Sequence, residues 1–216
     1  SFTFKNIVSV HTIILAAGHG SRMKSNKAKV LQKIGGTSML EKICYTAGAV
    51  SSDITLVVGF DKESVIKESN NYNLNITSSL QPKPIGTGDA VRCGLDKVHD
   101  SSKVLVLYGD VPLIKKETLQ KLIASSDTGL SILTTVLDNP FGYGRVRTND
   151  KNEALEIVEE KDATDEERQI KEIFTGVLCG SKALLEEGLS KITNSNAAGE
   201  FYLTDLVSII NEKGIR

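Results

Sequence analysis

The sequence has few cysteines, almost no net charge and no long apolar run, and each shortage excludes a class of protein. Its 216 residues contain only Cys44, Cys93 and Cys179, an odd number at wide spacing. This argues against a disulfide framework and a zinc site and favours a reducing compartment, so we expect a cytoplasmic protein. With 26 basic and 27 acidic residues the net charge is −1, and no nucleic-acid partner is expected.

Membrane and secretory signals are also missing. No apolar run approaches the roughly 18 residues that a membrane-spanning helix needs, so no membrane partner is expected. The first residues, SFTFKNIVSVH, lack the basic region and cleavage signature of a signal peptide. Apolar residues at 40% and charged residues at 25% are ordinary for a soluble globular protein. We expect an N-terminal tail over residues 1–11 and one domain over residues 12–216.

Over the first 137 residues, apolar segments alternate with segments of helical periodicity. The predicted strands cover residues 12–16, 54–59, 74–80, 103–110 and 130–137. Three helices are predicted between them: over residues 37–49, from near Gly86 to Val98, and around residues 119–123. In the first, Ser38 and Glu41 have the spacing of a capping box. This alternation predicts an α/β fold with a doubly wound, Rossmann-like sheet. The segment KVLVLYGD is a continuous apolar run, typical of a strand covered on both faces.

The pattern changes after residue 138. YGRVRT and ALEIVEE flank the turn NDKN and predict a β-hairpin. The charged segment KDATDEERQIKE is expected to form a solvated loop or a short helix, followed by a strand, IFTGVLCG, and two helices near residues 182–190 and 203–213. We therefore expect a small hairpin-containing lobe beside the sheet.

Glycines and cations gather directly after the first strand, in LAAGHGSRMKSNKAKVL (residues 15–31). Gly18 and Gly20 would let the backbone approach a ligand closely, and successive N–H groups can surround an oxyanion. The cations around them are Arg22, Lys24, Lys27 and Lys29. The dinucleotide fingerprint and the Walker pattern are both absent, and from glycine spacing alone a lysine-rich surface loop is an equally good interpretation.

Two further stretches follow predicted strands. In QPKPIGTGDA (residues 81–90), Gly86 and Thr87 open a helix whose N-terminus suits a phosphate or a polar base edge, and Gln81 has an amide to offer a nucleobase. A proline-rich turn is the alternative. Asp110 ends the strongest strand, at the edge where α/β sheets bind ligands, and a carboxylate beside a phosphate suits Mg²⁺.

The remaining candidates are weaker. Tyr143 lies between two glycines in NPFGYGRV, which predicts a turn or a sugar contact equally well, and Glu159 falls at a strand end where it could accept from a sugar hydroxyl. In the sequence, His11, His19 and His99 are scattered, with no Cys or carboxylate at the spacing of a metal-ligand pair. With no G-x-S-x-G motif and no Cys–His arrangement, a covalent nucleophile is not expected.

Taken together, these motifs closely resemble the uridyltransferase domain of the bacterial bifunctional N-acetylglucosamine-1-phosphate uridyltransferase/glucosamine-1-phosphate acetyltransferases. The resemblance covers the chain from Thr12 onward. It rests on LAAGHGSRM, AKVL, GTGDA, LYGDVPLI, NPFGYGRV, IVEEKDATDEERQIKEI, TGVL and AAGEFYLTD. The first of these marks the broad nucleotidyltransferase superfamily, whereas LYGDVPLI, the KDAT stretch and GEFYLTD are more specific.

The resemblance implies an Mg²⁺-dependent transfer of UMP from UTP to N-acetylglucosamine 1-phosphate, which gives UDP-N-acetylglucosamine and pyrophosphate. In-line transfer of this kind needs positioning and charge neutralisation rather than a protein nucleophile. By the resemblance, Arg22 holds the triphosphate, Lys29 neutralises the attacking phosphate and the α-phosphate, and Asp110 holds Mg²⁺. The implied substrate contacts are Leu15, Ala16, Ala17, Gly18, Gln81, Gly86 and Thr87 around the uridine, and Gly144, Glu159, Tyr202 and Thr204 on the sugar side. Tyr108 and Gly109 are further implied substrate-binding residues.

The chain departs from the family pattern at several positions. Ala28 replaces the proline before the family's catalytic lysine, which removes a fixed φ and would loosen the loop. Pro84 stands where the family commonly has an amide, and Phe174 replaces an asparagine that contacts the sugar or ribose. The family's second Mg²⁺ ligand, an asparagine, and its acetyltransferase β-helix would lie beyond Arg216. Full-length relatives form trimers through that β-helix, so we expect this fragment to be monomeric.

Three alternatives stay open. The chain is expected to be a related nucleotidyltransferase if it prefers glucose 1-phosphate or CTP. It is expected to be a catalytically weak nucleotide-binding module if Phe174 and the missing ligand abolish turnover. A purely structural interaction domain fits poorly, because it would not need glycine-rich loops at several strand ends.

Overall fold

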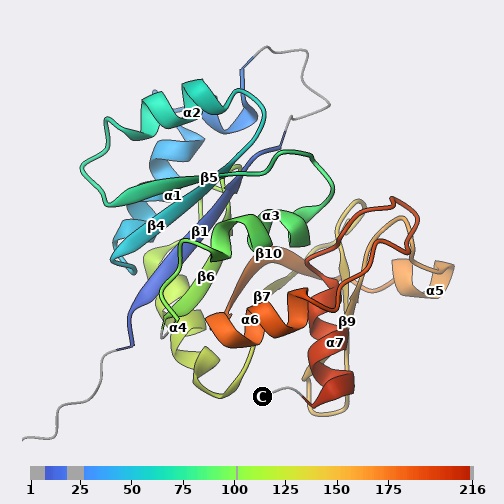
Figure 1. The fold of residues 1–216 in the computed structure, drawn as a ribbon. Coiled ribbons are helices and arrows are strands. Elements are labelled where there is room, and N and C mark those ends of the chain that lie inside the picture. The colour runs from blue at the N-terminus through green and yellow to red at the C-terminus, as the bar shows by residue number, and fades with distance from the viewer. Residues whose placement is uncertain (1–7, 19–26, 101, 215–216) are drawn as a thin grey trace, which may run out of the picture.

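A mixed eight-stranded sheet forms the centre of the computed structural model, which describes residues 8–18, 27–100 and 102–214 (Figure 1). The strand order is β5-β4-β1-β6-β10-β8-β9, and β7 pairs with β10 off this path. The strands are β1 (Val10–Ala16), β4 (Asp53–Val58), β5 (Ile76–Leu80), β6 (Lys103–Tyr108), β7 (Ser131–Val136), β8 (Arg145–Thr148), β9 (Ala154–Val158) and β10 (Glu172–Ser181). A separate small hairpin pairs β2 (Lys33–Ile34) with β3 (Thr37–Ser38).

Helices cover both faces of this sheet (Figure 1). They are α1 (Met39–Gly48), α2 (Lys62–Ser69), α3 (Thr87–Leu95), α4 (Lys116–Ser125), α5 (Asp165–Arg168), α6 (Lys182–Leu189) and α7 (Asp205–Lys213), with 3-10 turns η1 (Lys29–Leu31) and η2 (Ser126–Thr128). Along β1, Ile13 packs with α3, α6 and α7, whereas its neighbour Ile14 packs with α1 and α4 on the opposite face. Successive side chains of a strand point to opposite faces of the sheet, and here both faces are covered by helices, so continuous apolar runs are expected. The predicted doubly wound fold is confirmed.

The two halves of the sheet differ in strand direction. β5, β4, β1 and β6 are parallel, whereas β10 is antiparallel to β6, β7 and β8. β10 therefore lies between β6 and β7, which follow one another in the sequence. Its register shifts between Phe174 and Leu178, and within that irregularity Gly176 has φ +91°. A Cβ at position 176 would lie 2.6 Å from Cε2 of Tyr108, so this irregularity of β10 requires glycine.

Local helix signals were partly different from those expected. Ser38 caps α1, since its Oγ accepts from the Glu41 N–H at 3.1 Å and donates to the Glu68 carboxylate of α2. Within the described residues, the reciprocal bond from the Ser38 N–H to the Glu41 side chain, which would complete a capping box, is not found. A complete box occurs at Thr164 and Glu167, at the start of α5, within the predicted charged segment. β8 and β9 form the predicted hairpin, and β1 begins at Val10, two residues before the expected domain boundary.

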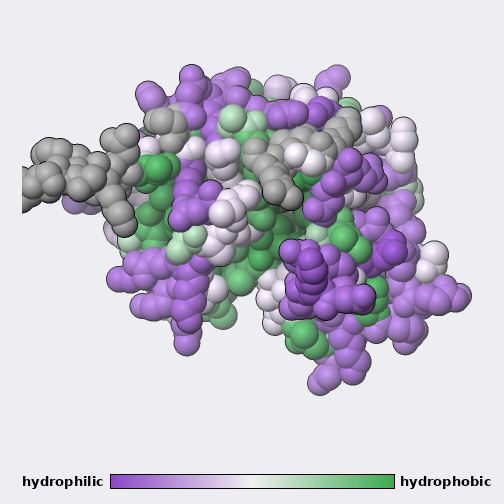
Figure 2. Space-filling model, turned by 90° about the horizontal axis from the view of Figure 1, so that it is seen from below, coloured by the Kyte–Doolittle hydropathy of each residue, from purple (hydrophilic) through white to green (hydrophobic). Residues whose placement is uncertain are grey.

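Seen from below, hydrophilic side chains form most of the outline and apolar side chains gather towards the middle (Figure 2). Within the described residues, no helix combines the length and apolar character needed to cross a bilayer. All three cysteines are free, and burial raises the pKa of Cys44 to about 12. A thiol held neutral in this way is unreactive.

Candidate active site

The carboxyl ends of the parallel strands open into a pocket of about 330 Å³. This is the edge of an α/β sheet at which ligands bind. Ten of the residues implied by the sequence line it: Leu15, Ala16, Ala17, Gly18, Lys29, Gln81, Gly86, Thr87, Tyr108 and Asp110. Arg22, also expected here, lies outside the described residues. Glu200 lines the pocket as well and was not singled out from the sequence, although it belongs to the stretch AAGEFYLTD.

Lys29 and Asp110 form an ion pair in this pocket, with Nζ and Oδ2 2.7 Å apart. Asp110 follows β6, whereas Lys29 comes from η1, 81 positions earlier in the chain. The two meet because η1 packs closely on the end of β6: a Cβ at Gly109 would lie 2.7 Å from Cγ1 of Val30. Gly109 is thus required by the contact that brings Lys29 to Asp110.

The backbone before Lys29 is fixed by a contact that the sequence did not reveal. Ala28 is fully buried, and its N–H donates to Oδ2 of Asp61 at 3.0 Å. Asp61 itself has φ +53°, in the left-handed region that a non-glycine residue rarely adopts. Ala28 was expected to loosen this loop because it replaces a proline, but alanine has a free N–H that proline lacks, and here that N–H is bound.

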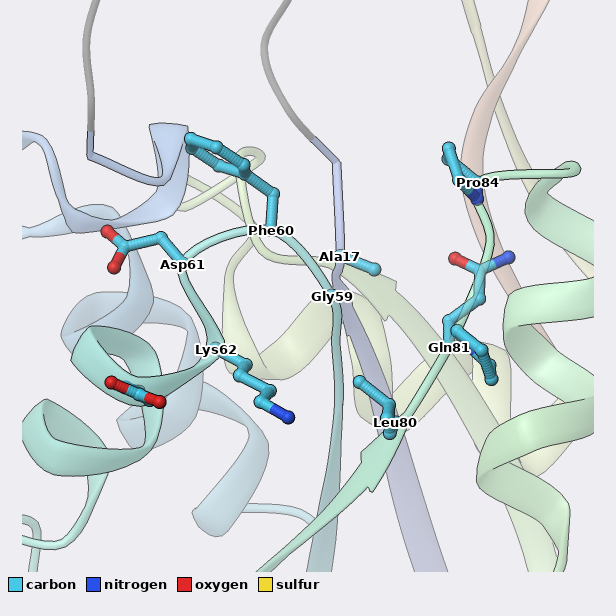
Figure 3. A pocket seen from close by; sticks show the side chains of 10 residues that line it. Ala17, Gly59, Phe60, Asp61, Lys62, Leu80, Gln81 and Pro84 are labelled. Carbon is cyan, nitrogen blue, oxygen red and sulfur yellow. The ribbon is translucent and has the colours of Figure 1, made fainter.

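Gln81 is held by helix α3 rather than standing free. Its side chain is buried, and Nε2 donates to the Gly86 carbonyl at 3.0 Å and to Oδ2 of Asp89 at 2.9 Å. Figure 3 shows the amide oxygen on the side of Ala17 and the nitrogen on the side of α3. The close-up also shows a neighbouring pocket of about 650 Å³ that shares Ala17, Gln81 and Pro84 with the first.

The glycines that open α3 meet the chain, not open space. A Cβ at Gly86 would collide with the backbone of Phe201, and the Gly88 N–H donates to the Phe201 carbonyl at 2.8 Å. Gly86 also has φ +128°. The Gly88 N–H is therefore already bound within the fold and is not open to a ligand.

The residues expected on the sugar side form a second cluster. Glu159 and Tyr202 line a separate pocket of about 250 Å³. Thr204 donates to Oε1 of Glu159 at 3.0 Å, and a Cβ at Gly144 would lie 3.6 Å from that same oxygen. The four residues are thus together, although none of them lines the 330 Å³ pocket.

The two clusters are joined through Thr87. Its Oγ1 accepts from the Leu203 N–H at 3.0 Å, and Thr87 lines the 330 Å³ pocket together with Tyr108. Leu203 lies between Tyr202 and Thr204 in the sequence, so the second cluster is anchored directly to the N-terminus of α3. The segment before it is also anchored, since the Phe201 N–H donates to the Ile85 carbonyl at 2.8 Å.

Burial shifts the acidity of several side chains in this region. It raises the pKa of Glu159, although the hydrogen bond from Thr204 opposes the shift. It also raises the pKa of Tyr108, and that of Tyr202 to about 12, where the nearby carboxylate of Asp162 adds to the effect. Both tyrosines therefore stay neutral near pH 7 and can donate hydrogen bonds.

Phe174 belongs to the hydrophobic core. Its side chain is buried with Ile157 and Val146, while its backbone N–H donates to the Gly144 carbonyl at 3.0 Å. Phe174 thus touches the second cluster through its backbone, and its ring contributes no polar group.

Comparison with known proteins identifies the same architecture. A family model described as "MobA-like NTP transferase domain" matches residues 12–186. The bifunctional protein GlmU of Psychrobacter sp. (strain PRwf-1) is 43% identical over 205 residues, which is 94% of this chain and 45% of that protein. GlmU of Ruthia magnifica is 44% identical over 201 residues, or 93% of this chain and 44% of that protein. The chain thus spans a little under half the length of the curated relatives it matches, and the resemblance expected from its motifs is confirmed.

Solved structures confirm the fold. A UDP-glucose pyrophosphorylase complexed with UDP-glucose has a TM-score of 0.77 at 15% identity, over 95% of this chain and 88% of that one. A candidate glucose-1-phosphate thymidylyltransferase from Bacillus anthracis has the same TM-score at 20% identity, over 96% of this chain and 85% of that one. Both share the mixed α/β sheet.

Proposed function

Because the chain belongs to the family of MobA-like NTP transferase domains, we propose that it transfers UMP from UTP to N-acetylglucosamine 1-phosphate and releases pyrophosphate. One observation carries the proposal: a single pocket at the carboxyl ends of the parallel strands gathers the loop after β1, the N-terminus of α3, Lys29 and Asp110. The similarity to GlmU proteins supports the choice of substrates. On this proposal residues 12–216 act as one nucleotidyltransferase domain.

The chemistry follows from charge. The sugar phosphate attacks the α-phosphorus of UTP, a bond to the α-phosphorus forms, and the bond to the leaving pyrophosphate breaks. Negative charge is concentrated on the phosphates throughout, so a cation held at this point lowers the barrier. Lys29 would supply this cation and neutralise the attacking phosphate and the α-phosphate. Arg22, outside the described residues, would hold the triphosphate.

Asp110 is suited to share a divalent cation with the substrates. Among the described residues no group of three or more His, Cys, Asp or Glu side chains could hold a metal ion. One half-buried carboxylate combined with phosphate oxygens and water is, however, an ordinary ligand set for Mg²⁺. Asp110 would therefore hold Mg²⁺, which supplies positive charge to the phosphates when it is bound.

The uridine and the sugar would occupy the two joined clusters. The backbone from Leu15 to Gly18 would hold the nucleoside together with Gln81, Gly86 and Thr87. Gly144, Glu159, Tyr202 and Thr204 would line the sugar side, where Glu159 can accept from a hydroxyl group. Tyr108 and Gly109 would contribute to the substrate site at the end of β6, because Tyr108 lines the 330 Å³ pocket and Gly109 leaves room for η1.

The setting of the reaction is also part of the proposal. We propose that the chain works in the cytoplasm as a monomer. Its product would supply the synthesis of peptidoglycan and lipopolysaccharide.

The experiment is a pyrophosphate-release assay with UTP, N-acetylglucosamine 1-phosphate and Mg²⁺, with glucose 1-phosphate and CTP as parallel substrates. Turnover selective for the first pair supports the proposal. Lys29→Ala should lower kcat on the order of a hundredfold or more, as removal of one transition-state charge contact does. Absence of turnover by the unmodified chain, or full turnover by Lys29→Ala, would refute the proposed role of this pocket.

A further inference from the structure

The orientation of the Gln81 amide is fixed by its two partners. Both partners, Oδ2 of the Asp89 carboxylate and the Gly86 carbonyl oxygen, are hydrogen-bond acceptors. The end of the amide that faces them must therefore be the NH₂ group. The two distances, 2.9 and 3.0 Å, are ordinary for N–H···O bonds. The amide orientation thus follows from the chemistry of its neighbours.

The other end of the amide is consequently an acceptor that faces the ligand side. Gln81 lines the 330 Å³ pocket, and Figure 3 shows its Oε1 on the side of Ala17, away from α3. Within the part of the chain that the structure describes, no hydrogen bond to Oε1 is found. A base bound here would therefore meet a hydrogen-bond acceptor and not a donor.

We propose that Asp89 is a specificity-determining residue that selects uracil over cytosine by holding the Gln81 amide in this orientation. This inference rests on the proposed function. The only donor on the ring edge of uracil is N3–H, which pairs with Oε1. In cytosine N3 carries no hydrogen, so the same pose would set a lone pair against Oε1 and leave a buried acceptor unpaired. Asp89 acts through Gln81 and touches no substrate, so it is a positioning residue.

Asp89 is well placed for this task. It lies in the first turn of α3, where the helix dipole favours a negative charge, and it is half-buried. The start of α3 also supplies the second hydrogen bond that orients the Gln81 amide, because Gly86 is the N-cap of α3 and its carbonyl accepts from Nε2. An aspartate at this position would also stabilise the helix without any effect on the base, so the experiment must separate the two roles.

The test compares UTP and CTP with four chains: the unmodified chain, Asp89→Asn, Gln81→Ala and the double variant. Asparagine can turn an NH₂ group towards Gln81, which removes one of the two hydrogen bonds that hold the Gln81 amide in this orientation. Affinities are measured by calorimetry without the acceptor sugar, and kcat/KM is measured by pyrophosphate release. Asp96→Asn is the matched control, because Asp96 ends the same helix, carries the same charge and is exposed.

Asp89→Asn should lower the preference for UTP over CTP by about tenfold, chiefly by weakening UTP binding. Asp96→Asn should leave the preference unchanged. In the Gln81→Ala background, Asp89→Asn should have no further effect on the preference, because the amide through which it acts is gone.

Three results would overturn the inference. These are equal weakening of UTP and CTP binding by Asp89→Asn, an effect of Asp89→Asn on the preference that persists in the Gln81→Ala background, and equal use of UTP and CTP by the unmodified chain. The last result leaves nucleotidyl transfer standing and removes only the base selection. An unmodified chain that binds neither nucleotide would instead overturn the proposed function and this inference with it.

Discussion

Asp61 should control the position of Lys29, and Asp61→Gly isolates that effect. The substitution removes the carboxylate that accepts from the buried N–H of Ala28, while glycine adopts the φ of +53° without strain. A hydrogen bond between a buried amide and a charged acceptor contributes about 1.5–3 kcal/mol. Relief of left-handed strain returns about 1 kcal/mol. The net loss in the free energy of unfolding should thus be small, about 0.5–2 kcal/mol.

The effect on catalysis should be larger than the effect on stability. Without Asp61 the backbone before Lys29 loses its anchor, and the 2.7 Å approach of Nζ to Asp110 depends on that backbone. Small displacements of a charge-neutralising group are costly, so kcat should fall on the order of tenfold to a hundredfold. The KM for UTP should change less, because the Asp61 carboxylate bonds to the backbone before Lys29 and not to the Gln81 amide. The assay is pyrophosphate release, with the melting temperature measured in parallel.

Two further variants make this prediction refutable. Asp61→Asn keeps an acceptor oxygen and tolerates the left-handed conformation, so it should retain most of the activity. Asn152→Gly is the matched backbone control: Asn152 has φ +60° in the turn between β8 and β9, far along the chain from Lys29. It should leave kcat unchanged. If Asp61→Gly keeps the unmodified kcat, or if Asp61→Asn loses as much as Asp61→Gly, the anchoring argument is refuted.

Two other predictions concern stability. Gly176→Ala should destabilise the fold by about 2 kcal/mol or more in urea unfolding, because it adds backbone strain at φ +91° and a clash with Tyr108. Gly142→Ala is the control: it has φ +85° but open space around it, so it should lower the free energy of unfolding by less. Equal losses in the two variants would contradict the packing argument. Burial lowers the pKa of His11 in the folded chain below the ordinary value of 6.5. Between the folded and the unfolded pKa the unfolded chain binds more protons, so the free energy of unfolding should fall as the pH drops from about 6.5. His11→Gln should flatten this dependence, and an unchanged slope would show that another group causes it.

The fold could be predicted because its main signals are local. The apolar runs of β1 and β6, the hairpin of β8 and β9 and the periodicity of α1 each lie within one segment of sequence. α2 was missed because it has few apolar positions: of its eight residues only Val65 and Ser69 are buried. The place of β10 between β6 and β7 could not be inferred either, since strand order depends on pairing between distant segments.

The candidate site shows the same division. Strand ends located Asp110 and Gln81 correctly, because carboxyl ends of parallel strands meet at one edge. What the sequence could not show is which distant residues hold these groups. Asp61 and Asp89 look like ordinary solvated acids in the sequence, yet one binds the backbone before Lys29 and the other binds the Gln81 amide. Their partners become visible only when the chain is folded.

Three glycines of the site are required by packing: Gly86, Gly88 and Gly109 each lie where another part of the chain comes too close for a Cβ. At Gly109 the neighbour is Val30, which directly follows Lys29. A larger residue at position 109 would therefore act on catalysis by pushing η1, and Lys29 with it, away from Asp110. Gly109 marks the site because η1 and the end of β6 must pack this closely for two charges 81 positions apart to meet.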